Sequence, residues 1–314
     1  MATSGRIGLE QAVGGGLLAP STEGRLGLAE QTRPRSQLAM TWRRLRRDRF
    51  ALIGLGILVL TVTLAVAAPL VSPHDPLAQN SKIRLSPIGT SGHLLGTDGN
   101  GRDILSRLIY GSRIALLVAT VPVLVAAGVG LVLGLLAGYL GGWVDTIFMR
   151  FADILFAFPA ILLAIAIVAA LGPKLINAMM ALAIVFIPAF ARLVRASVLS
   201  LRERDYVLAA RASGATSGRI IVRHILVNAL STIVVFATLQ TGQMIIFASA
   251  LSFLGLGVQP PTPDWGAMAN DGRNSMLIAP WVTTLPGIAI FVVSIGFNLL
   301  GDGLRDALDP TLKT

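Results

Sequence analysis

The sequence has 314 residues, of which 54% are hydrophobic and only 13% are charged, and its mean hydropathy is +0.74. Charged residues make up about a quarter of a soluble domain, so this composition excludes a soluble globular protein and predicts an all-α polytopic protein embedded in membrane lipid. The formal net charge of +10 would suit nucleic acid, but the basic residues flank apolar runs without a base-stacking aromatic surface, so the charge indicates membrane topology.

The N-terminal part of the chain combines a polar tail with one apolar run. Residues 1–38 are rich in Gly, Ser, Pro and Arg without apolar periodicity, which predicts a disordered cytoplasmic tail. Residues 39–110 form an N-terminal region in which an arginine cluster precedes the apolar run 50–71. That run can cross about 30 Å of hydrocarbon and is too long for the core of a signal peptide. We therefore expect a permanent span whose N-terminal side is cytoplasmic.

A polar segment follows the first span and is expected to lie outside the membrane. Residues 72–110 contain prolines, glycines and the sequence LGTDGNGRD. Asp103 is predicted to begin a short amphipathic helix that lies along the membrane surface, with its apolar residues on one side. Those apolar residues are Ile104, Leu105, Leu108 and Ile109.

Five further apolar runs complete a predicted bundle of six spans with both termini in the cytoplasm. They cover residues 114–140, 154–171, 175–191, 225–254 and 281–300. Residues 141–153 are predicted to form a cytoplasmic turn, residues 255–280 an external loop, and residues 304–314 a cytoplasmic tail.

Glycines and prolines inside these runs predict how the spans pack and bend. Gly130, Gly134 and Gly138 recur at four-residue spacing, which permits close approach of two helices in lipid. Pro159 and Pro188 are expected to kink the third and fourth spans.

A polar, arginine-bearing stretch at residues 205–229 separates two long apolar runs. In a helix, Tyr206, Ala209, Ala210 and Ser213 share one face, made of small side chains around a single tyrosine. Such a face allows close approach to another surface.

The glycine that follows this face predicts where the helix stops. Gly214 suits the left-handed position just past a helix end, and Thr216 or Ser217 is expected to cap the next helix. An interfacial helix that only connects two spans would show the same pattern.

The chain lacks the residues that power an ion-driven pump or an ATPase. The predicted spans after the first contain no acidic or basic residue, whereas a proton- or sodium-driven pump usually carries such residues. None of the three lysines stands in a P-loop, so the chain is predicted not to hydrolyse ATP and not to be an enzyme.

A metal centre is not predicted. The sequence has no Cys, and its three His are far apart along the chain. Asp98, Asn100 and Asp103 lack the order of an EF-hand loop, and no glutamate closes a twelve-residue calcium loop.

Four ordered blocks carry a resemblance to a known family. In LAARASG, the residues Leu208, Ala209, Ala210 and Gly214 occupy positions of the EAA loop of ABC-importer permeases. LGTDGNGRD, LSFLGLGVQPPTPDWGAM and NLLGDGLRDALDP resemble further signatures of the second permease component of dipeptide, oligopeptide and nickel systems. Leu208 departs from the glutamate of the EAA pattern, and Val227 departs from its later proline.

This resemblance implies a type I ABC-importer permease fold with the permease domain at residues 111–303, in the plasma (inner) membrane. It implies a sister permease, two cytoplasmic ATPase subunits and an extracytoplasmic substrate-binding protein as partners. ATP would be used by the ATPase subunits, and no cofactor would be bound by this chain. The EAA loop would be the coupling helix that docks on an ATPase subunit. The residues assigned to this coupling are Tyr206, Leu208, Ala209, Ala210, Ser213, Gly214 and Ala215.

Polar residues within the later spans are candidates for lining a translocation path. They are Gln240, Thr241, Gln243 and Asn298. Ordinary interhelical hydrogen bonding explains them at least as well. The sequence does not identify the solute, and a stand-alone channel, a secondary carrier or a membrane scaffold are the alternatives from other classes.

Overall fold

The structure is a computed structural model that describes residues 37–308, with side chains from residue 41 onward. The predicted tail at residues 1–38 lies outside this part, except that Gln37 and Leu38 begin the first helix. Residues 309–314 of the predicted C-terminal tail also lie outside it. Between residues 37 and 308 the chain is helical, and its β-type contacts are two isolated bridges, which confirms the all-α prediction.

The described residues contain eleven α-helices and three short helical turns. In chain order the α-helices are α1 (Gln37–Leu45), α2 (Arg49–Val71), α3 (Ile104–Leu140), α4 (Gly142–Phe156), α5 (Ala160–Leu171), α6 (Leu175–Leu201), α7 (Asp205–Ala212), α8 (Ser217–Ile220), α9 (Val227–Phe253), α10 (Trp265–Gly272) and α11 (Trp281–Leu308). A π-helical turn, Ile221–Leu226, joins α8 to α9.

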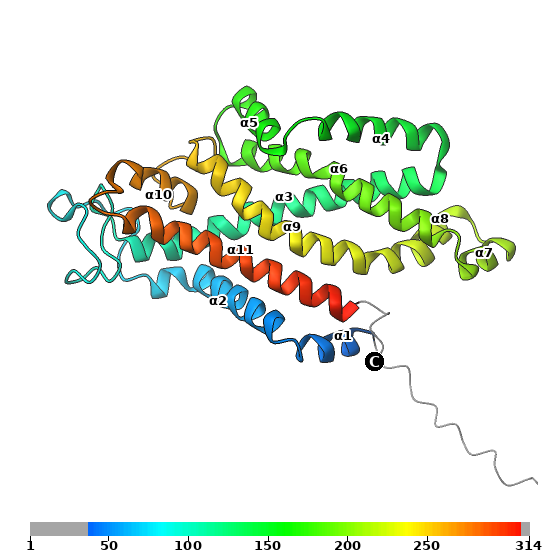
Figure 1. The fold of residues 1–314 in the computed structure, drawn as a ribbon, viewed down its shortest axis with the longest axis horizontal. Coiled ribbons are helices and arrows are strands. Elements are labelled where there is room, and N and C mark those ends of the chain that lie inside the picture. Colours follow the sequence, from blue (N-terminus) through cyan, green and yellow to red (C-terminus); the bar gives the residue numbers. More distant parts are fainter. Residues whose placement is uncertain (1–36, 309–314) are drawn as a thin grey trace, which may run out of the picture.

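The long helices form a bundle with two distinct ends (Figure 1). Helices α2, α3, α6, α9 and α11 run along the long axis and pack side by side. Helix α7 lies at one end, with α1 and the last turns of α11 on the same side. Helix α10 and the segment between α2 and α3 lie at the opposite end. We call these the α7 end and the α10 end.

The predicted surface helix after Asp103 is wrong. Asp103 does cap a helix, because its carboxylate accepts a hydrogen bond from the Ser106 amide at 2.8 Å, but α3 continues unbroken to Leu140. Its first turns are covered by protein rather than by lipid headgroups. Ile104 is fully buried, and the Trp265 indole donates to the Leu108 carbonyl at 3.0 Å. Residues expected to lie along the membrane therefore form the start of a long span.

The predicted turn at residues 141–153 is also wrong, and the third span is bent. Gly141 and Gly142 have φ values of 66° and 56°, so two residues reverse the chain and α4 begins at once. Helices α4 and α5 meet at 90°, and Pro159 stands at the break, immediately before α5. The described residues hold five single spans, or six if this bent pair counts as one. By contrast, α6 passes through Pro188 without a break.

The glycines of α3 pack as predicted. A methyl group on Gly134 would come within 2.6 Å of the Ala191 carbonyl oxygen, and one on Gly138 within 2.8 Å of the Val198 Cβ. These distances are too short for a side chain, so α3 and α6 touch backbone to backbone.

Two later helices are longer than the predicted runs. Helix α8, the π turn and α9 form one continuous stretch from Ser217 to Phe253, and α11 extends to Leu308 rather than ending at residue 300. The predicted external loop at residues 255–280 contains α10.

Candidate functional site

Helix α7 ends where the sequence predicts. Gly214 has a φ of 79°, which strains any residue with a Cβ. Its amide donates to the Arg211 carbonyl at 3.0 Å, and the Ala215 amide donates to the Ala210 carbonyl at 3.1 Å. These are the two bonds of a Schellman motif, which confirms the helix stop at Gly214. Thr216 occupies the N-cap of α8, although its side chain makes no capping hydrogen bond.

One residue anchors α7 to the bundle. Val207 has no exposed surface, and it is the buried residue of α7. It belongs to an apolar cluster with Val198 of α6, Ile220 of α8 and Ile225 of the π turn. The sequence interpretation missed Val207, because only the contacts of α7 with its neighbours distinguish this residue from the adjacent apolar Leu208, which is exposed.

The remaining surface of α7 faces outward. Tyr206 is 42% exposed and Leu208 is 47% exposed, and Ala209 and Ser213 are exposed as well. Ala210 is half-buried, so the predicted face is open except at this residue. Aromatic and aliphatic side chains beside small ones form a surface suited to contact with another protein.

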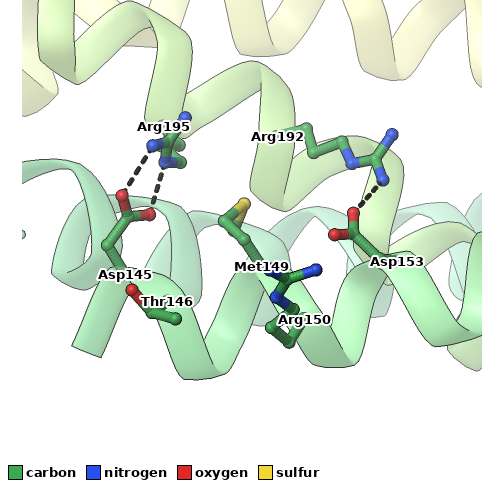
Figure 2. A pocket seen from close by; sticks show the side chains of 7 residues that line it. All are labelled: Asp145, Thr146, Met149, Arg150, Asp153, Arg192 and Arg195. Atoms are coloured by element: carbon green, nitrogen blue, oxygen red, sulfur yellow. Dashed lines mark hydrogen bonds and ion pairs between the residues drawn. The ribbon is translucent and has the colours of Figure 1, made fainter. Parts of the chain in front are cut away.

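Two ion pairs that the sequence did not predict join α4 to α6. The Arg195 guanidinium binds both carboxylate oxygens of Asp145 at 2.5 and 2.6 Å, and Arg192 contacts Asp153 at 2.5 Å. Figure 2 shows the two pairs at the edge of a pocket of about 360 Å³. The pocket is also lined by Thr146, Met149 and Arg150.

These charges were missed because the helices extend beyond the apolar runs. Asp153 and Arg192 each lie one residue outside a predicted span, at 154–171 and 175–191. Their side chains are 52% and 46% exposed, so this pair contributes little to stability. The bidentate pair of Asp145 and Arg195 is less exposed and more geometrically constrained, so it is the stronger link between α4 and α6.

The four candidate path residues lie on α9 and α11, and the Asn298 amide oxygen lies 2.9 Å from where a Cβ on Gly242 would stand. Thr241 is buried, and its hydroxyl donates to the Ala237 carbonyl at 2.8 Å within the same helix. Gln240 is half-buried, whereas Gln243 and Asn298 are exposed. The hydrogen bond that does join α9 to α11 here was missed by the sequence interpretation: the Ser294 hydroxyl donates to the Gly242 carbonyl at 2.9 Å.

Residues 130–314, which are 59% of the chain, match the family described as binding-protein-dependent transport system inner membrane component. The chain belongs to this family. Residues 36–87 also match the N-terminal TM domain of oligopeptide transport permease C, so the two matches lie in the order expected of one permease subunit.

Individual permeases are similar to this chain over most of its length. The dipeptide transport system permease protein of Alkalihalophilus pseudofirmus is 48% identical over 273 residues, which cover 87% of this chain and 90% of the relative. The glutathione transport system permease protein of Pectobacterium atrosepticum is 50% identical over 273 residues, 87% of this chain and 91% of the relative. The predicted ABC-importer permease function is therefore confirmed.

At the α10 end of the permease, the LGTDGNGRD segment builds a buried ionic network. Arg102 binds Asp98 at 2.6 Å and Asp271, which lies in α10, at 3.2 Å. The Arg107 guanidinium lies 3.6 Å from the same Asp98 carboxylate. Asp98 also accepts hydrogen bonds from the amides of Asn100 and Arg102. Asp98, one of the residues weighed for a calcium loop, thus binds two arginines of the permease.

Proposed function

We propose that α7 is the coupling helix through which ATPase subunits drive this permease. One observation carries the proposal: α7 lies at one end of the bundle (Figure 1) with Tyr206 and Leu208 exposed. On the opposite side of the helix, Val207 packs in an apolar cluster with residues of α6 and α9. A helix attached on one side and apolar on the other is suited to dock on a partner and pass its movement to the spans. The proposal also takes in Ala209, Ala210, Ser213, Gly214 and Ala215.

The energy for transport would come from partners. The chain has no P-loop lysine, and we propose that it is not an enzyme and binds neither ATP nor another cofactor. The partners would be a sister permease, two ATPase subunits and a substrate-binding protein. Closure of the ATPase pair on ATP would move α7 and switch the bundle between its two openings.

We propose that the permease spans the plasma (inner) membrane, with the α7 end and both termini in the cytoplasm and the α10 end external. The basic clusters at residues 43–49 and 192–223 lie at the α7 end, which agrees with the excess of Lys and Arg in cytoplasmic segments. Cysteine labelling tests this orientation, because the chain has no native Cys. Leu277 is fully exposed at the α10 end and Ser217 is exposed at the α7 end. A cysteine at Leu277 reachable only from the cytoplasm would reverse the proposed topology.

The transported solute is proposed to be a small peptide. This rests on relatives named for dipeptide and glutathione transport, which share a short peptide backbone. We also propose that Gln240, Gln243 and Asn298 line the translocation path. Thr241 is the weakest candidate for lining it, because its hydroxyl already donates a hydrogen bond to the Ala237 carbonyl. Uptake of labelled dipeptide and glutathione by the reconstituted complex would decide between the two.

Disulfide cross-linking tests the coupling role. In the complex with its ATPase subunits, a cysteine at Ala209 should cross-link to a cysteine in the groove of an ATPase subunit. A cysteine at Gly142, exposed in the α3–α4 turn, is the matched control and should cross-link poorly. Equal cross-linking of the two positions, or none at Ala209, would remove the assignment of α7.

A further inference from the structure

Two of the three histidines, far apart in sequence, meet at the α10 end. His74 follows α2 and His93 lies in the next loop, yet their rings stack with centroids 4.5 Å apart at an angle of 27°. Both rings face the carboxylate of Asp103, the N-cap of α3. The separation of the histidines along the sequence argued against a metal centre, but His74 and His93 are close together in the folded chain.

Three ligand atoms converge at this point. The His93 Nδ1 lies 2.8 Å from the Asp103 Oδ1, and the His74 Nδ1 lies 3.8 Å from the same oxygen. Each of the three residues offers one ligand atom, a ring nitrogen of each histidine and a carboxylate oxygen of Asp103, and these ligand atoms lie within 4.8 Å of one another. Ligands held about 2.0–2.1 Å from one tetrahedral metal ion stand roughly 3.3 Å apart. Shifts of about half an ångström would adjust the two nitrogen–oxygen distances, and a ligand pair as far apart as 4.8 Å would have to close by about 1.5 Å.

One of these atoms is not explained by the hydrogen bonds of the protein. The His74 Nδ1 is buried and has no hydrogen-bond partner, because 3.8 Å to Asp103 is too long for a bond. A buried polar atom without a partner costs about 1–3 kcal/mol. His93 alone is enough to form the hydrogen bond with Asp103, and this bond does not explain why the His74 ring lies beside them. The position of His74 therefore points to a ligand shared by all three residues.

Ser106 orients the carboxylate of Asp103. The other oxygen of Asp103 accepts hydrogen bonds from the Ser106 amide at 2.8 Å and the Ser106 hydroxyl at 2.6 Å. The same hydroxyl accepts from the His74 amide at 3.1 Å. Ser106 thus holds both the carboxylate and the backbone of His74, which is how outer partners fix the ligands of metal sites.

The ligand set selects a class of ion. We propose that His74, His93 and Asp103 bind one divalent transition metal of the zinc, nickel and copper(II) group. Two imidazoles and one carboxylate suit these ions, whereas calcium and magnesium require oxygen ligands that the cluster does not supply. The Asp103 side chain is 1% exposed, His93 14% and His74 38%, so the site opens toward solvent on the His74 side, where water can complete the coordination.

The bound ion would act as a clip at the α10 end. His74 belongs to the segment after α2, and Asp103 begins α3, so one ion would tie the ends of the first two spans together. Metal coordination by residues distant in the chain stabilises the folded state over the unfolded chain. This inference does not depend on which solute is transported.

Metal binding to the purified full-length permease tests the site. The chain should carry an affinity tag without histidine, be stripped with a chelator, and be dialysed against zinc before metal analysis. We expect close to one zinc ion per chain, and a higher unfolding temperature with zinc. His74→Ala and His93→Ala should abolish both effects, and Ser106→Ala should weaken zinc affinity about 10- to 100-fold because it only orients the ligands.

Two further variants keep the result interpretable. His224→Ala removes the third histidine, which lies beside Tyr206 at the α7 end, and should leave zinc binding unchanged. His93→Gln retains a donor for Asp103, so it should fold and elute normally while losing zinc. The proposal is overturned if the wild-type chain binds no more zinc than a His74→Ala/His93→Ala double variant, or if His224→Ala loses as much zinc as His74→Ala.

Discussion

The two ends of the bundle are built in opposite ways. At the α10 end, charged side chains lie inside the protein: those of Asp98, Arg102 and Arg107 are 6%, 5% and 3% exposed. At the α7 end, Val207 is the buried residue of α7, and nearby charges face solvent, as the 76% exposure of the Glu203 side chain shows.

This difference indicates a division of labour. Buried ion pairs fix one geometry, because removing a partner leaves a charge unpaired inside the protein. A helix held by one apolar side chain and ended by a glycine turn can shift at much lower cost. We therefore infer that the α10 end is the rigid frame of the permease, and that the α7 end moves when the ATPase subunits act on it.

The largest expected effect comes from breaking the rigid frame. Asp98→Ala removes the shared partner of Arg102 and Arg107 and should destabilise the permease by about 3–5 kcal/mol, seen as a lower unfolding temperature and less protein in the membrane. Glu203→Ala is the control at the α7 end, where the exposed pair with Arg202, 3.9 Å apart, should contribute less than about 1 kcal/mol. Equal losses for the two variants would contradict the proposed difference between the ends.

The next effect is functional rather than structural. Gly214→Val should abolish transport while the protein still reaches the membrane, because a left-handed valine costs at least about 1–2 kcal/mol and forces the Schellman turn to relax. An added Cβ at Gly214 meets nothing within 4 Å, so backbone strain is the cause rather than a clash.

Gly142 provides a matched control for this substitution. It also has a positive φ, 56°, and open space around an added Cβ, but it lies in the α3–α4 turn. Gly142→Val should therefore carry similar strain and a milder transport defect. Normal uptake by Gly214→Val in proteoliposomes, or loss of that protein from the membrane as its only defect, would end the coupling assignment.

A smaller effect on stability is expected from the exposed face of α7. Tyr206→Ala should change the free energy of unfolding by no more than about 0.5 kcal/mol, since the side chain is partly in solvent, yet it should reduce ATPase-driven uptake. Leu277→Ala, at a fully exposed position of the α10 end, should change neither quantity. If Tyr206→Ala transports as well as Leu277→Ala, the tyrosine does not contact the ATPase.

The smallest expected effect is a gain in stability, and its size should depend on pH. Burial raises the pKa of Asp264, and hydrogen bonds from the Ala267 amide, Ser252 and the Gly266 amide only partly oppose it. Because the folded-state pKa lies above the unfolded value of about 3.9, this carboxyl stabilises the fold most at low pH, and that stability falls as pH rises through the folded-state pKa.

Asp264→Asn tests this sign. Asparagine keeps the N-cap of α10 but has no charge to bury, so the variant should unfold at a slightly higher temperature than the wild type at neutral pH. The difference should shrink as pH falls through the folded-state pKa toward the unfolded value of about 3.9, and it should stay constant below that value. A difference that grows on acidification would show that the carboxylate is favoured in the folded state.

Local sequence features were enough to predict most of the apolar spans and the end of α7. The apolar runs gave the spans, because lipid demands about twenty apolar residues in a helix whatever packs beside them. Gly214 marked the end of α7, because the left-handed turn is a property of the residue itself. The four-residue glycine spacing likewise predicted a close helix contact along this span, since close approach needs small side chains, and the structure shows that α6 is the partner.

Contacts between distant segments decided the rest. Whether the helix after Asp103 lies on the membrane or continues into α3 depended on Trp265, more than 150 residues away. The ion pairs of α4 with α6 required α4 to be a helix, which depended on a two-glycine reversal rather than on hydropathy. The anchor role of Val207 and the meeting of His74 with His93 also exist only in three dimensions, because residue spacing along a chain does not fix distances across loops.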